Sequence, residues 1–325
     1  MNPKEIFSIK EKREFERIAL KIFRYQASEC KPYKEYLDNL GFNTENVSSV
    51  SEIPFLPVSF FKNREVITGN APAEKVFSSS ATTGMTPSLH YVTDLSVYNH
   101  SLSLGFRLRY GKASDYAIVA LLPSYLEREG SSLVYMAEML MKESGHPDNG
   151  FYLYNQKELY EKLVKIKKSG SKCILLGVSF ALVDFATAFP LDFPELIVME
   201  TGGMKNTGRE LSRQEIHNII CKGFGVKTVH SEYGMAELLS QAYSQGEGLF
   251  FPPPWMEVII RDLNNPIRYL SSGKRGGINI IDLANLNSCS FIETGDMGVK
   301  TAGDSFEVHG RIKFSELRGC NLLLE

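Results

Sequence analysis

The chain has 325 residues, of which 43% are hydrophobic and 23% charged, and its formal net charge is −2. This composition is typical of a globular enzyme with a sizeable core, and the near-neutral balance gives no electrostatic basis for nucleic acid as the main partner. No stretch has the length and apolar character of a membrane span, and the charged start at 1–23 predicts an amphipathic helix, with no signal peptide. The five cysteines are scattered without CxxC spacing, which argues against a zinc site or disulfide framework and favours a reducing cytoplasm.

Helical spacing marks the first 40 residues, in which Phe15, Ile18 and Ile22 recur on one face of an expected helix. Gly41 is placed to end a second, shorter helix. The next apolar stretch, 53–61, is interrupted by prolines, so we expect a buried extended segment there.

From about residue 75 the pattern alternates between apolar runs and helical stretches. The runs at 116–122, 173–178 and 196–199 predict buried strands. Helices are expected around them, near residues 94–110, 131–144, 156–169, 179–188 and 209–222. Strand–helix alternation with nearly continuous apolar strands predicts a mainly parallel sheet covered by helices.

After residue 245 the helical signal fades, and short strands are expected at 257–260, 278–281, 290–292 and 306–308. We therefore predict a single α/β domain over 1–325, made of a helical region at 1–50, an α/β core at 51–245 and a β-rich subregion at 246–325 ending in a short tail. Ligands of such folds bind at the carboxyl ends of the strands.

Residues 78–88 (SSSATTGMTPS) form the most unusual segment, with six hydroxyl side chains before Pro87 and a glycine among them. Backbone N–H groups and small hydroxyls in a loop between two strands can wrap phosphate oxygens. The GxxxxGK signature of the Walker-type phosphate loop is absent. Taken alone, the segment is explained equally well by a solvated turn rich in serine and threonine.

Residues 231–237 (SEYGMAE) follow an expected strand at 226–230 and are predicted to start a helix. Tyr233 can stack on a base, and Glu237 can bind Mg²⁺, which takes one or two carboxylates together with substrate phosphates. Taken alone, the segment is better explained by a core tyrosine and a glutamate that stabilises the start of the helix.

The turn 293–296 (ETGD) and the pair Gly310 and Arg311 each follow an expected strand. A carboxylate and a guanidinium at neighbouring strand ends suit the hydroxyl groups of a ribose. A hairpin aspartate and a surface arginine are the commoner explanation for each residue separately.

These segments together resemble the motifs of the adenylate-forming (acyl-activating) superfamily, and they occur in the same order: SSATTG at 79–84, YGMAE at 233–237, TGD at 294–296 and GR at 310–311. Longer phrases are similar to its acyl-protein synthetase (LuxE-like) branch, the ligase component of the bacterial luciferase fatty-acid reductase. These are IPFLPVSFFK at 53–62, LPSYLEREGSSLVYMAEML at 122–140, ETGGMK at 200–205, SEYGMAELLSQAY at 231–243 and GRIKFSELRGCNLLL at 310–324. Phenylacetate–CoA ligases resemble the chain more distantly. The resemblance covers nearly the whole chain and implies the large N-terminal-type domain of that fold.

Carried over by position, the resemblance implies a site for ATP and Mg²⁺. The residues implied to cradle the phosphates are Ser79, Ser80, Thr82, Thr83 and Gly84. Those implied at the adenine are Gly202, Gly203, Gly234 and the stacking Tyr233, while Glu237 binds Mg²⁺ and Asp296 and Arg311 contact the ribose. The implied reaction is attack of a carboxylate on the α-phosphate, for which a metal and positioned donors must offset the repulsion between anions.

Several features depart from the superfamily pattern. Ala81 stands where the pattern has glycine, which costs about 1 kcal/mol if that backbone needs a positive φ. Ser88 stands where many relatives have a lysine after the proline, so one phosphate contact is expected to be missing. Lys205 is a candidate catalytic substitute for that charge, with a solvated lysine as the alternative. Most relatives also continue beyond the GR element into a mobile C-terminal domain that supplies a lysine for adenylation, and this chain is expected to lack it.

Cys320 matches the position of the cysteine to which acyl-protein synthetases are thought to transfer the acyl group. Nearby Arg318 would favour the thiolate, which is the nucleophile. A short tail would carry an acyl-thioester out of the pocket without a rotating domain. The alternative is a buried cysteine that packs beside Leu322 and Leu323.

The expected function is activation of a carboxylic acid, by the resemblance a fatty acid, as an acyl-adenylate, followed by transfer to a thiol. The acceptor is Cys320 or a partner such as an acyl carrier or reductase-like protein. Two alternatives stay open: an aryl-carboxylate–CoA ligase that uses free CoA, and a nucleotide-binding scaffold that has lost catalysis. Neither a nucleic-acid partner nor a membrane span is expected, a homo-oligomer is left open, and the acid is not identified.

Overall fold

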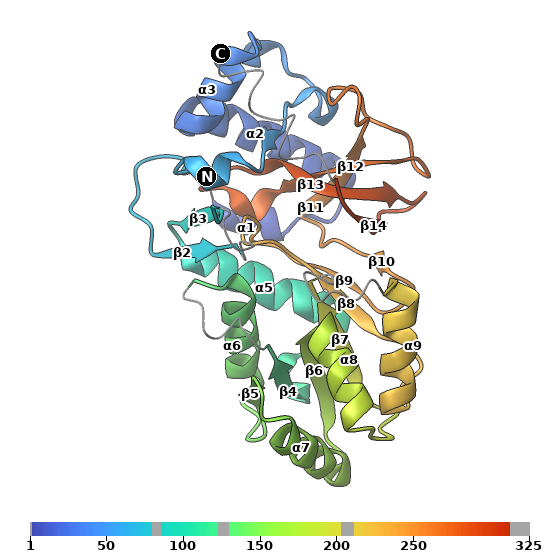
Figure 1. The fold of residues 1–325 in the computed structure, drawn as a ribbon. Helices are drawn as coiled ribbons and strands as arrows, with labels where there is room; N and C mark the ends of the chain where they lie inside the picture. Colours follow the sequence, from blue (N-terminus) through green and yellow to red (C-terminus); the bar gives the residue numbers. More distant parts are fainter. Residues whose placement is uncertain (1, 80–85, 123–129, 203–210, 313–325) are drawn as a thin grey trace. The chain divides into compact units, whose positions relative to one another are not determined.

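The computed structural model describes residues 2–79, 86–122, 130–202 and 211–312 (Figure 1). Chain contacts divide the protein into two compact units. Unit 1 contains Met1–Leu102, Gly234–Gln241 and Phe251–Glu325, and unit 2 contains Ser103–Tyr233 and Ala242–Phe250. One boundary falls inside α5 (Leu95–Tyr110), so a single helix contributes to both units.

Unit 2 is built on a sheet in the order β5-β4-β6-β7-β8-β9. Its strands are β4 (Tyr116–Leu121), β5 (Gly150–Tyr152), β6 (Lys172–Val178), β7 (Ile197–Thr201), β8 (His230–Tyr233) and β9 (Ala242–Ser244). All neighbours are parallel except β8 and β9. Every residue of β4 is buried, as expected for a strand covered on both faces. The predicted mainly parallel sheet is confirmed.

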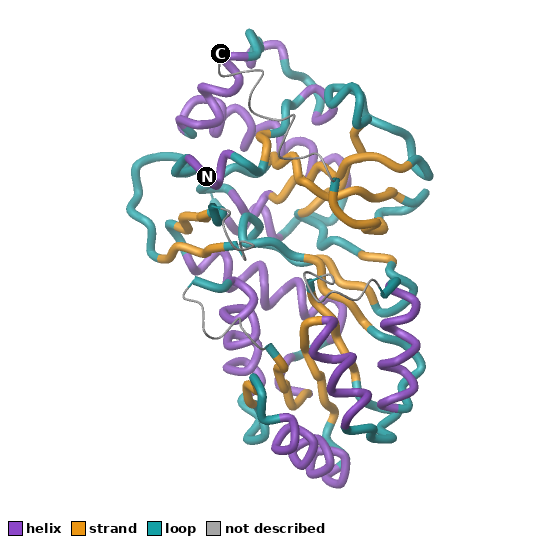
Figure 2. Tube along the Cα trace, in the orientation of Figure 1, coloured by secondary structure: helices purple, strands orange, loops and turns teal. Residues whose placement is uncertain are grey.

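Helices connect the parallel strands and pack on the faces of this sheet, as is usual for connections between parallel strands. They are α6 (Ser132–Ser144), α7 (Gln156–Ser169), α8 (Ser179–Ala188) and α9 (Arg213–Phe224). The 3-10 helix η3 (Ala113–Asp115) and the two-residue strand β10 (Leu249–Phe250) complete the unit. Helices α8 and α9 lie side by side on one face and α6 lies on the other (Figure 1). The alternation of helix and strand along this part of the chain is visible in Figure 2.

Unit 1 contains an antiparallel sheet in the order β14-β13-β12-β11. Its strands are β11 (Met256–Arg261), β12 (Arg275–Asp282), β13 (Phe291–Lys300) and β14 (Phe306–Arg311). The proline-interrupted segment supplies β1 (Leu56–Pro57), which pairs in parallel with β13, and then the short helix α4 (Phe60–Asn63). The predicted extended segment is therefore correct for its first half only.

Three helices at the start of the chain pack in unit 1, together with a separate hairpin. They are α1 (Pro3–Phe7), α2 (Lys12–Glu29) and α3 (Lys31–Asn39), followed by η1 (Thr44–Asn46), η2 (Val50–Glu52) and the hairpin β2 (Lys75–Ser78) and β3 (Leu89–Val92), with η4 (Leu283–Asn285) later in the chain. Phe291 of β13 lies against Phe23, Tyr33 and Phe55, with ring centroids 6.0–6.3 Å apart. The helical prediction for residues 1–40 is confirmed.

The predicted helix from residue 231 is wrong. The strand extends to Tyr233, and residues 234–241 have no regular secondary structure. Side chains distant in sequence satisfy the backbone here: Asn285 donates to the Glu237 carbonyl (2.8 Å), and Asp282 accepts from the Leu239 amide (2.9 Å). Because these groups already have partners, the segment does not need helical hydrogen bonds.

The two units take residues from both sides of the boundaries expected at 50 and 245, and the three-part division of the chain stays a prediction. Among the residues with described positions, no helix is both long and apolar enough to cross a membrane.

Candidate active site

Ser79 and Ser88 are hydrogen-bonded to each other where the paired part of the β2–β3 hairpin ends. The Ser79 amide donates to the Ser88 carbonyl (3.0 Å), and the Ser88 amide donates to Ser79 Oγ (2.9 Å). The residues between them at 80–85 lie outside the described part of the chain, including the predicted phosphate ligands Ser80, Thr82, Thr83 and Gly84.

Glu237 is a buried carboxylate in unit 1, with 5% of its surface exposed. Burial raises the pKa of Glu237, and Asp296 adds to this, while a hydrogen bond with the Ser88 side chain and the charge of Arg311 act in the opposite direction. Since burial has the largest effect, a cation bound here would stabilise the ionised form of Glu237.

Ser88, where one phosphate contact is expected to be missing, is a buried residue just before β3. Only 3% of its surface is exposed, and its side chain hydrogen-bonds with that of Glu237. The Ser88 hydroxyl thus favours the ionised form of the carboxylate predicted to bind the metal.

Asp296 and Arg311 lie directly opposite each other on β13 and β14, and Arg311 Nε is 3.6 Å from Asp296 Oδ1. The Asp296 side chain is 13% exposed and that of Arg311 is 69% exposed. The sheet therefore places a sheltered carboxylate beside a guanidinium that reaches solvent, and both act electrostatically on Glu237.

The turn predicted at 293–296 is wrong, because these residues belong to β13 and pair with its neighbouring strands. Buried Arg261 supports the part of β13 that carries Asp296. Its guanidinium donates to the Thr294 carbonyl (2.8 Å) and to Asn279 Oδ1 (2.8 Å), and it lies 3.5 Å from Glu293 Oε1. Burial lowers the pKa of Arg261, and the charges of Glu293 and Asp296 oppose that change. Arg261 was not predicted from the sequence, because an isolated arginine in an apolar strand has no motif around it.

His90 of β3 is a second residue that the sequence analysis did not select for the site. Its Nδ1 lies 2.9 Å from the Ala236 carbonyl, and 1% of its surface is exposed. Burial lowers the pKa of His90 to about 4, so the ring is neutral near pH 7. A carbonyl only accepts, and so we assign the proton to Nδ1.

In the part of the chain with described positions, no group of three or more His, Cys, Asp or Glu side chains forms a metal cage. Glu237 nevertheless fits Mg²⁺, because this ion commonly binds one or two protein carboxylates and completes its shell with water and substrate phosphates. A metal at Glu237 would therefore arrive together with a phosphate ligand.

In unit 2, Glu200 collects several partners near the end of β7. Its carboxylate accepts from Ser179 Oγ (2.8 Å), Ser231 Oγ (3.0 Å) and His217 Nε2 (3.0 Å), and Arg213 Nε lies 3.9 Å away. Burial by itself would raise the pKa of Glu200, but these partners, with His217 foremost, bring it below its ordinary value. This network rigidly joins the end of β7 to β8, α8 and α9.

Gly202 follows β7 and has a φ of 67°, which favours glycine. Ser179 Oγ lies 3.0 Å from the Gly202 carbonyl, so the network around Glu200 also reaches this turn. The predicted residues Gly203 and Lys205 lie in the segment 203–210, outside the described residues.

On the neighbouring strand β8, Glu232 and Tyr233 are both 8% exposed. Glu232 accepts a hydrogen bond from Thr201 Oγ1 at 2.5 Å, and burial raises the pKa of Glu232 to about 7. The Tyr233 ring lies edge-on to Phe250, with centroids 5.9 Å apart. The next residue, Gly234, is exposed and belongs to unit 1.

The structure thus brings Glu237, Asp296 and Arg311 together in unit 1, and Gly202 and Tyr233 at adjacent strand ends in unit 2. Their roles as ligand contacts stay predictions.

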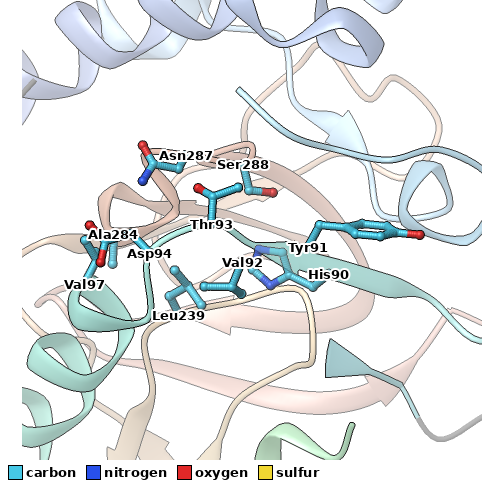
Figure 3. Close-up of a pocket in the computed structure, with 10 residues that line it drawn as sticks. All are labelled: His90, Tyr91, Val92, Thr93, Asp94, Val97, Leu239, Ala284, Asn287 and Ser288. Carbon is cyan, nitrogen blue, oxygen red and sulfur yellow. The ribbon is translucent and has the colours of Figure 1, made fainter. Parts of the chain in front are cut away.

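A small cavity of about 10 Å³ lies behind β3 in unit 1 (Figure 3). It is lined by His90, Thr93, Asp94, Leu239 and Ser288 among others. This is room for one water molecule and is far too small for a nucleotide or an acyl chain.

Cys320 lies outside the described residues. The other four cysteines are free: Cys30, Cys173 and Cys289 are buried, and Cys221 is partly exposed. Burial raises the pKa of each of these four thiols, which disfavours the reactive thiolate and agrees with a structural role.

The arrangement of these elements is that of the adenylate-forming ligases. A structure of 2-hydroxyisobutyryl-CoA ligase in complex with 2-HIB-AMP and CoA superimposes with a TM-score of 0.69 at 13% identity, over 93% of this chain and 70% of that one. A long-chain-fatty-acid–CoA ligase from Archaeoglobus fulgidus matches with a TM-score of 0.52 at 18% identity, over 74% of this chain and 51% of that one. The predicted α/β fold class is confirmed.

The family follows from the sequence comparison. Residues 2–325 match the acyl-protein synthetase family, LuxE, and the chain belongs to it. A curated relative, the long-chain-fatty-acid–luciferin-component ligase of Aliivibrio fischeri, is 23% identical over 350 aligned residues, which span 99% of this chain and 91% of that protein. The chain is accordingly an acyl-adenylate-forming ligase.

Proposed function

We propose that the protein activates a fatty acid with ATP and Mg²⁺ and then transfers the acyl group to a thiol. The observation that carries this proposal is the trio in unit 1, where buried Glu237 lies under the electrostatic influence of the paired Asp296 and Arg311. Three such groups beside a hydroxyl-rich hairpin suit a ribose, a metal and a triphosphate, as the four sequence motifs imply.

Each described residue has a task in this proposal. Asp296 accepts hydrogen bonds from the ribose hydroxyls, and Arg311 donates to them or to a phosphate. Glu237 supplies the carboxylate for Mg²⁺, which would neutralise charge on the phosphates during the reaction. In unit 2, Gly202 offers backbone without a side chain to the adenine, and Tyr233 offers its ring.

The chemistry has two steps. A carboxylate oxygen of the acid attacks the α-phosphorus of ATP, the new O–P bond forms, and the bond to the bridging oxygen breaks so that pyrophosphate leaves. A thiolate then attacks the acyl carbonyl carbon, the C–S bond forms and the C–O bond to AMP breaks. The residues hold the reactants in line and offset the repulsion between the anions.

The family and the Aliivibrio fischeri relative support the substrate and the acceptor. The family is described as acyl-protein synthetases, and the Aliivibrio fischeri relative as acting on long-chain fatty acids. We propose Cys320 as the first acceptor, with an acyl carrier or reductase-like protein next in line. A free thiol acceptor requires a reducing compartment, so the cytoplasm is the proposed setting.

Acid-dependent exchange of labelled pyrophosphate into ATP tests the first step. We expect exchange with long-chain fatty acids, a strict need for Mg²⁺, and a loss of at least about 100-fold in Glu237→Gln if this carboxylate contributes as strongly as one electrostatic catalytic group. Acids from two to eighteen carbons and a set of aryl acids identify the substrate class. ATP binding without exchange for any acid would contradict the proposal and favour a scaffold.

Labelling with radioactive fatty acid and ATP tests the acceptor. The wild type should acquire a protein-bound label that neutral hydroxylamine releases, because a thioester is sensitive to it. Cys320→Ser should lose this label and keep pyrophosphate exchange, whereas Cys221→Ser, which removes the partly exposed thiol, should keep both. Undiminished label in Cys320→Ser would rule out this acceptor, and turnover of free CoA by that variant would favour a CoA ligase.

A further inference from the structure

The segment Gly234–Gln241 carries Glu237 and has no regular secondary structure, so other elements must fix its position. Two of its carbonyl groups are held by side chains. Asn285 donates to the carbonyl of Glu237 (2.8 Å), and His90 donates to the carbonyl of Ala236 (2.9 Å). Both peptide units that flank the Glu237 side chain are therefore anchored.

Two buried side chains, at the start of β3 and just before it, act on this segment. Ser88, immediately before β3, and His90, within it, are two positions apart and both are buried. Residues two apart in a strand point to the same side. Ser88 bonds with the carboxylate of Glu237 while His90 bonds with the preceding carbonyl, so β3 holds both the backbone and the side chain.

The second nitrogen of His90 indicates how its ring is kept in place. Nε2 is buried and has no hydrogen-bond partner among the residues with described positions. His90 also lines the small cavity of about 10 Å³, together with Thr93 and Ser288 (Figure 3). That volume admits one water molecule, which can donate to Nε2. The ring is further packed edge-on against Phe61, with centroids 5.6 Å apart.

We propose that Ser88 and His90 are positioning residues that hold Glu237 in the orientation in which it binds Mg²⁺ with ATP. The inference rests on the proposed function. It also assigns a role to Ser88. This serine does not place a positive charge on the phosphate itself, but it orients the carboxylate that binds the metal cation.

The test compares ATP binding in saturating Mg²⁺ with ATP binding in EDTA, both by calorimetry. In Ser88→Ala and His90→Leu we expect MgATP to bind about 5- to 10-fold more weakly, the loss typical of one buried hydrogen bond, and metal-free ATP to bind within about 2-fold of the wild type. The Mg²⁺ concentration that half-saturates pyrophosphate exchange should rise by the same factor. A residue that merely supports folding would weaken both forms of ATP equally.

Conservative variants sharpen the result. The side-chain amide of asparagine can donate from about the place of Nδ1, so His90→Asn should restore the Mg²⁺ dependence, whereas His90→Gln places its amide nearer Nε2 and should not. Ser144→Ala is the matched control, because it also removes a buried serine hydroxyl, which donates to the Tyr116 carbonyl at 2.6 Å. Thermal unfolding identifies any variant that has lost its fold, and Ser88→Ala is the milder of the two.

The outcomes separate this inference from the proposed function. A wild-type protein that binds no ATP would overturn both. In a second outcome, the wild type binds MgATP and the folded variants Ser88→Ala, His90→Asn, His90→Gln and His90→Leu all bind it equally well. That result would overturn only the positioning role of Ser88 and His90. Equal weakening of MgATP and metal-free ATP would also reject the role in metal binding.

Discussion

At the scale of single residues, buried carboxylates set the chemistry of this protein, and each is treated differently. Glu200 has enough hydrogen-bond donors and positive charge to stay ionised despite its burial. Glu237 and Glu232 have fewer such partners, so burial raises the pKa of both. Burying an ionised carboxylate costs free energy, which must be offset by other interactions. At Glu237 a bound metal would provide such an interaction.

Glu232 allows a direct test of how burial affects the stability of the protein through the pKa of a carboxylate. Burial raises the pKa of Glu232 to about 7 in the folded state from an ordinary value of 4.5, so the folded state binds the proton more tightly. The stability that this proton provides is complete below about pH 4.5 and is lost as the pH rises through 7. Glu232→Gln should remove this loss and make the protein more stable than the wild type at pH 8, by on the order of 3 kcal/mol.

Chemical denaturation of both proteins at pH 4.5, 6, 7 and 8 measures the difference. Glutamine keeps an acceptor for the Thr201 hydroxyl, so the comparison isolates the ionisation. Parallel stability curves for the wild type and the variant over this range would show that Glu232 is not the group responsible.

At the scale of elements, strands rather than helices position the residues of the candidate site. Asp296 and Arg311 face each other because β13 and β14 are paired in that register, and Thr294 is held by Arg261 from β11. A single residue slip between β13 and β14 would separate the pair, since successive side chains point to opposite faces.

Gly277 of β12 makes room for this arrangement. A Cβ atom at Gly277 would lie 2.5 Å from Arg261 Cζ, and Arg261 has little freedom to move because it is 4% exposed and hydrogen-bonded. We expect Gly277→Ala to destabilise the protein by about 1–3 kcal/mol, as overpacking does, and to raise the KM for ATP by displacing β13 at Thr294.

Denaturant unfolding and steady-state kinetics check this expectation against Gly303→Ala. An added Cβ at Gly303 meets no atom within 4 Å, so that variant should match the wild type in both measurements. If Gly277→Ala also matched the wild type, the proposed packing of Arg261 against β12 would be refuted.

At the scale of the whole molecule, the chain passes between its two units several times. The YGMAE motif is divided by a boundary, with Tyr233 in unit 2 and Glu237 in unit 1. The sequence motifs are thus distributed over both units. This division could not be read from the sequence, in which the helical signal fades after residue 245 and nothing marks residues 102 or 233 as boundaries.

Local periodicity determined much of the fold. Apolar runs of strand length located β4, β6 and β7, because these strands are largely buried on both faces. The strand expected at 226–230 lies instead at His230–Tyr233, and the short, partly buried β5 was not expected. The helix expected after residue 231 was wrong, because its backbone groups bind Asn285, Asp282 and His90 instead of one another. Such tertiary partners leave no trace in local spacing.

The sequence by itself determined the order of the motifs and the class of ligase to which the chain belongs. The tertiary structure alone decided that Ser88 contacts Glu237, that His90 holds the peptide before it, and that Arg261 supports Asp296. The physical reason is distance along the chain: His90 and Ala236 are separated by 146 positions, and only folding brings them within hydrogen-bond reach. Burial then gives those contacts their strength, since a polar group removed from water must find its partner inside the protein.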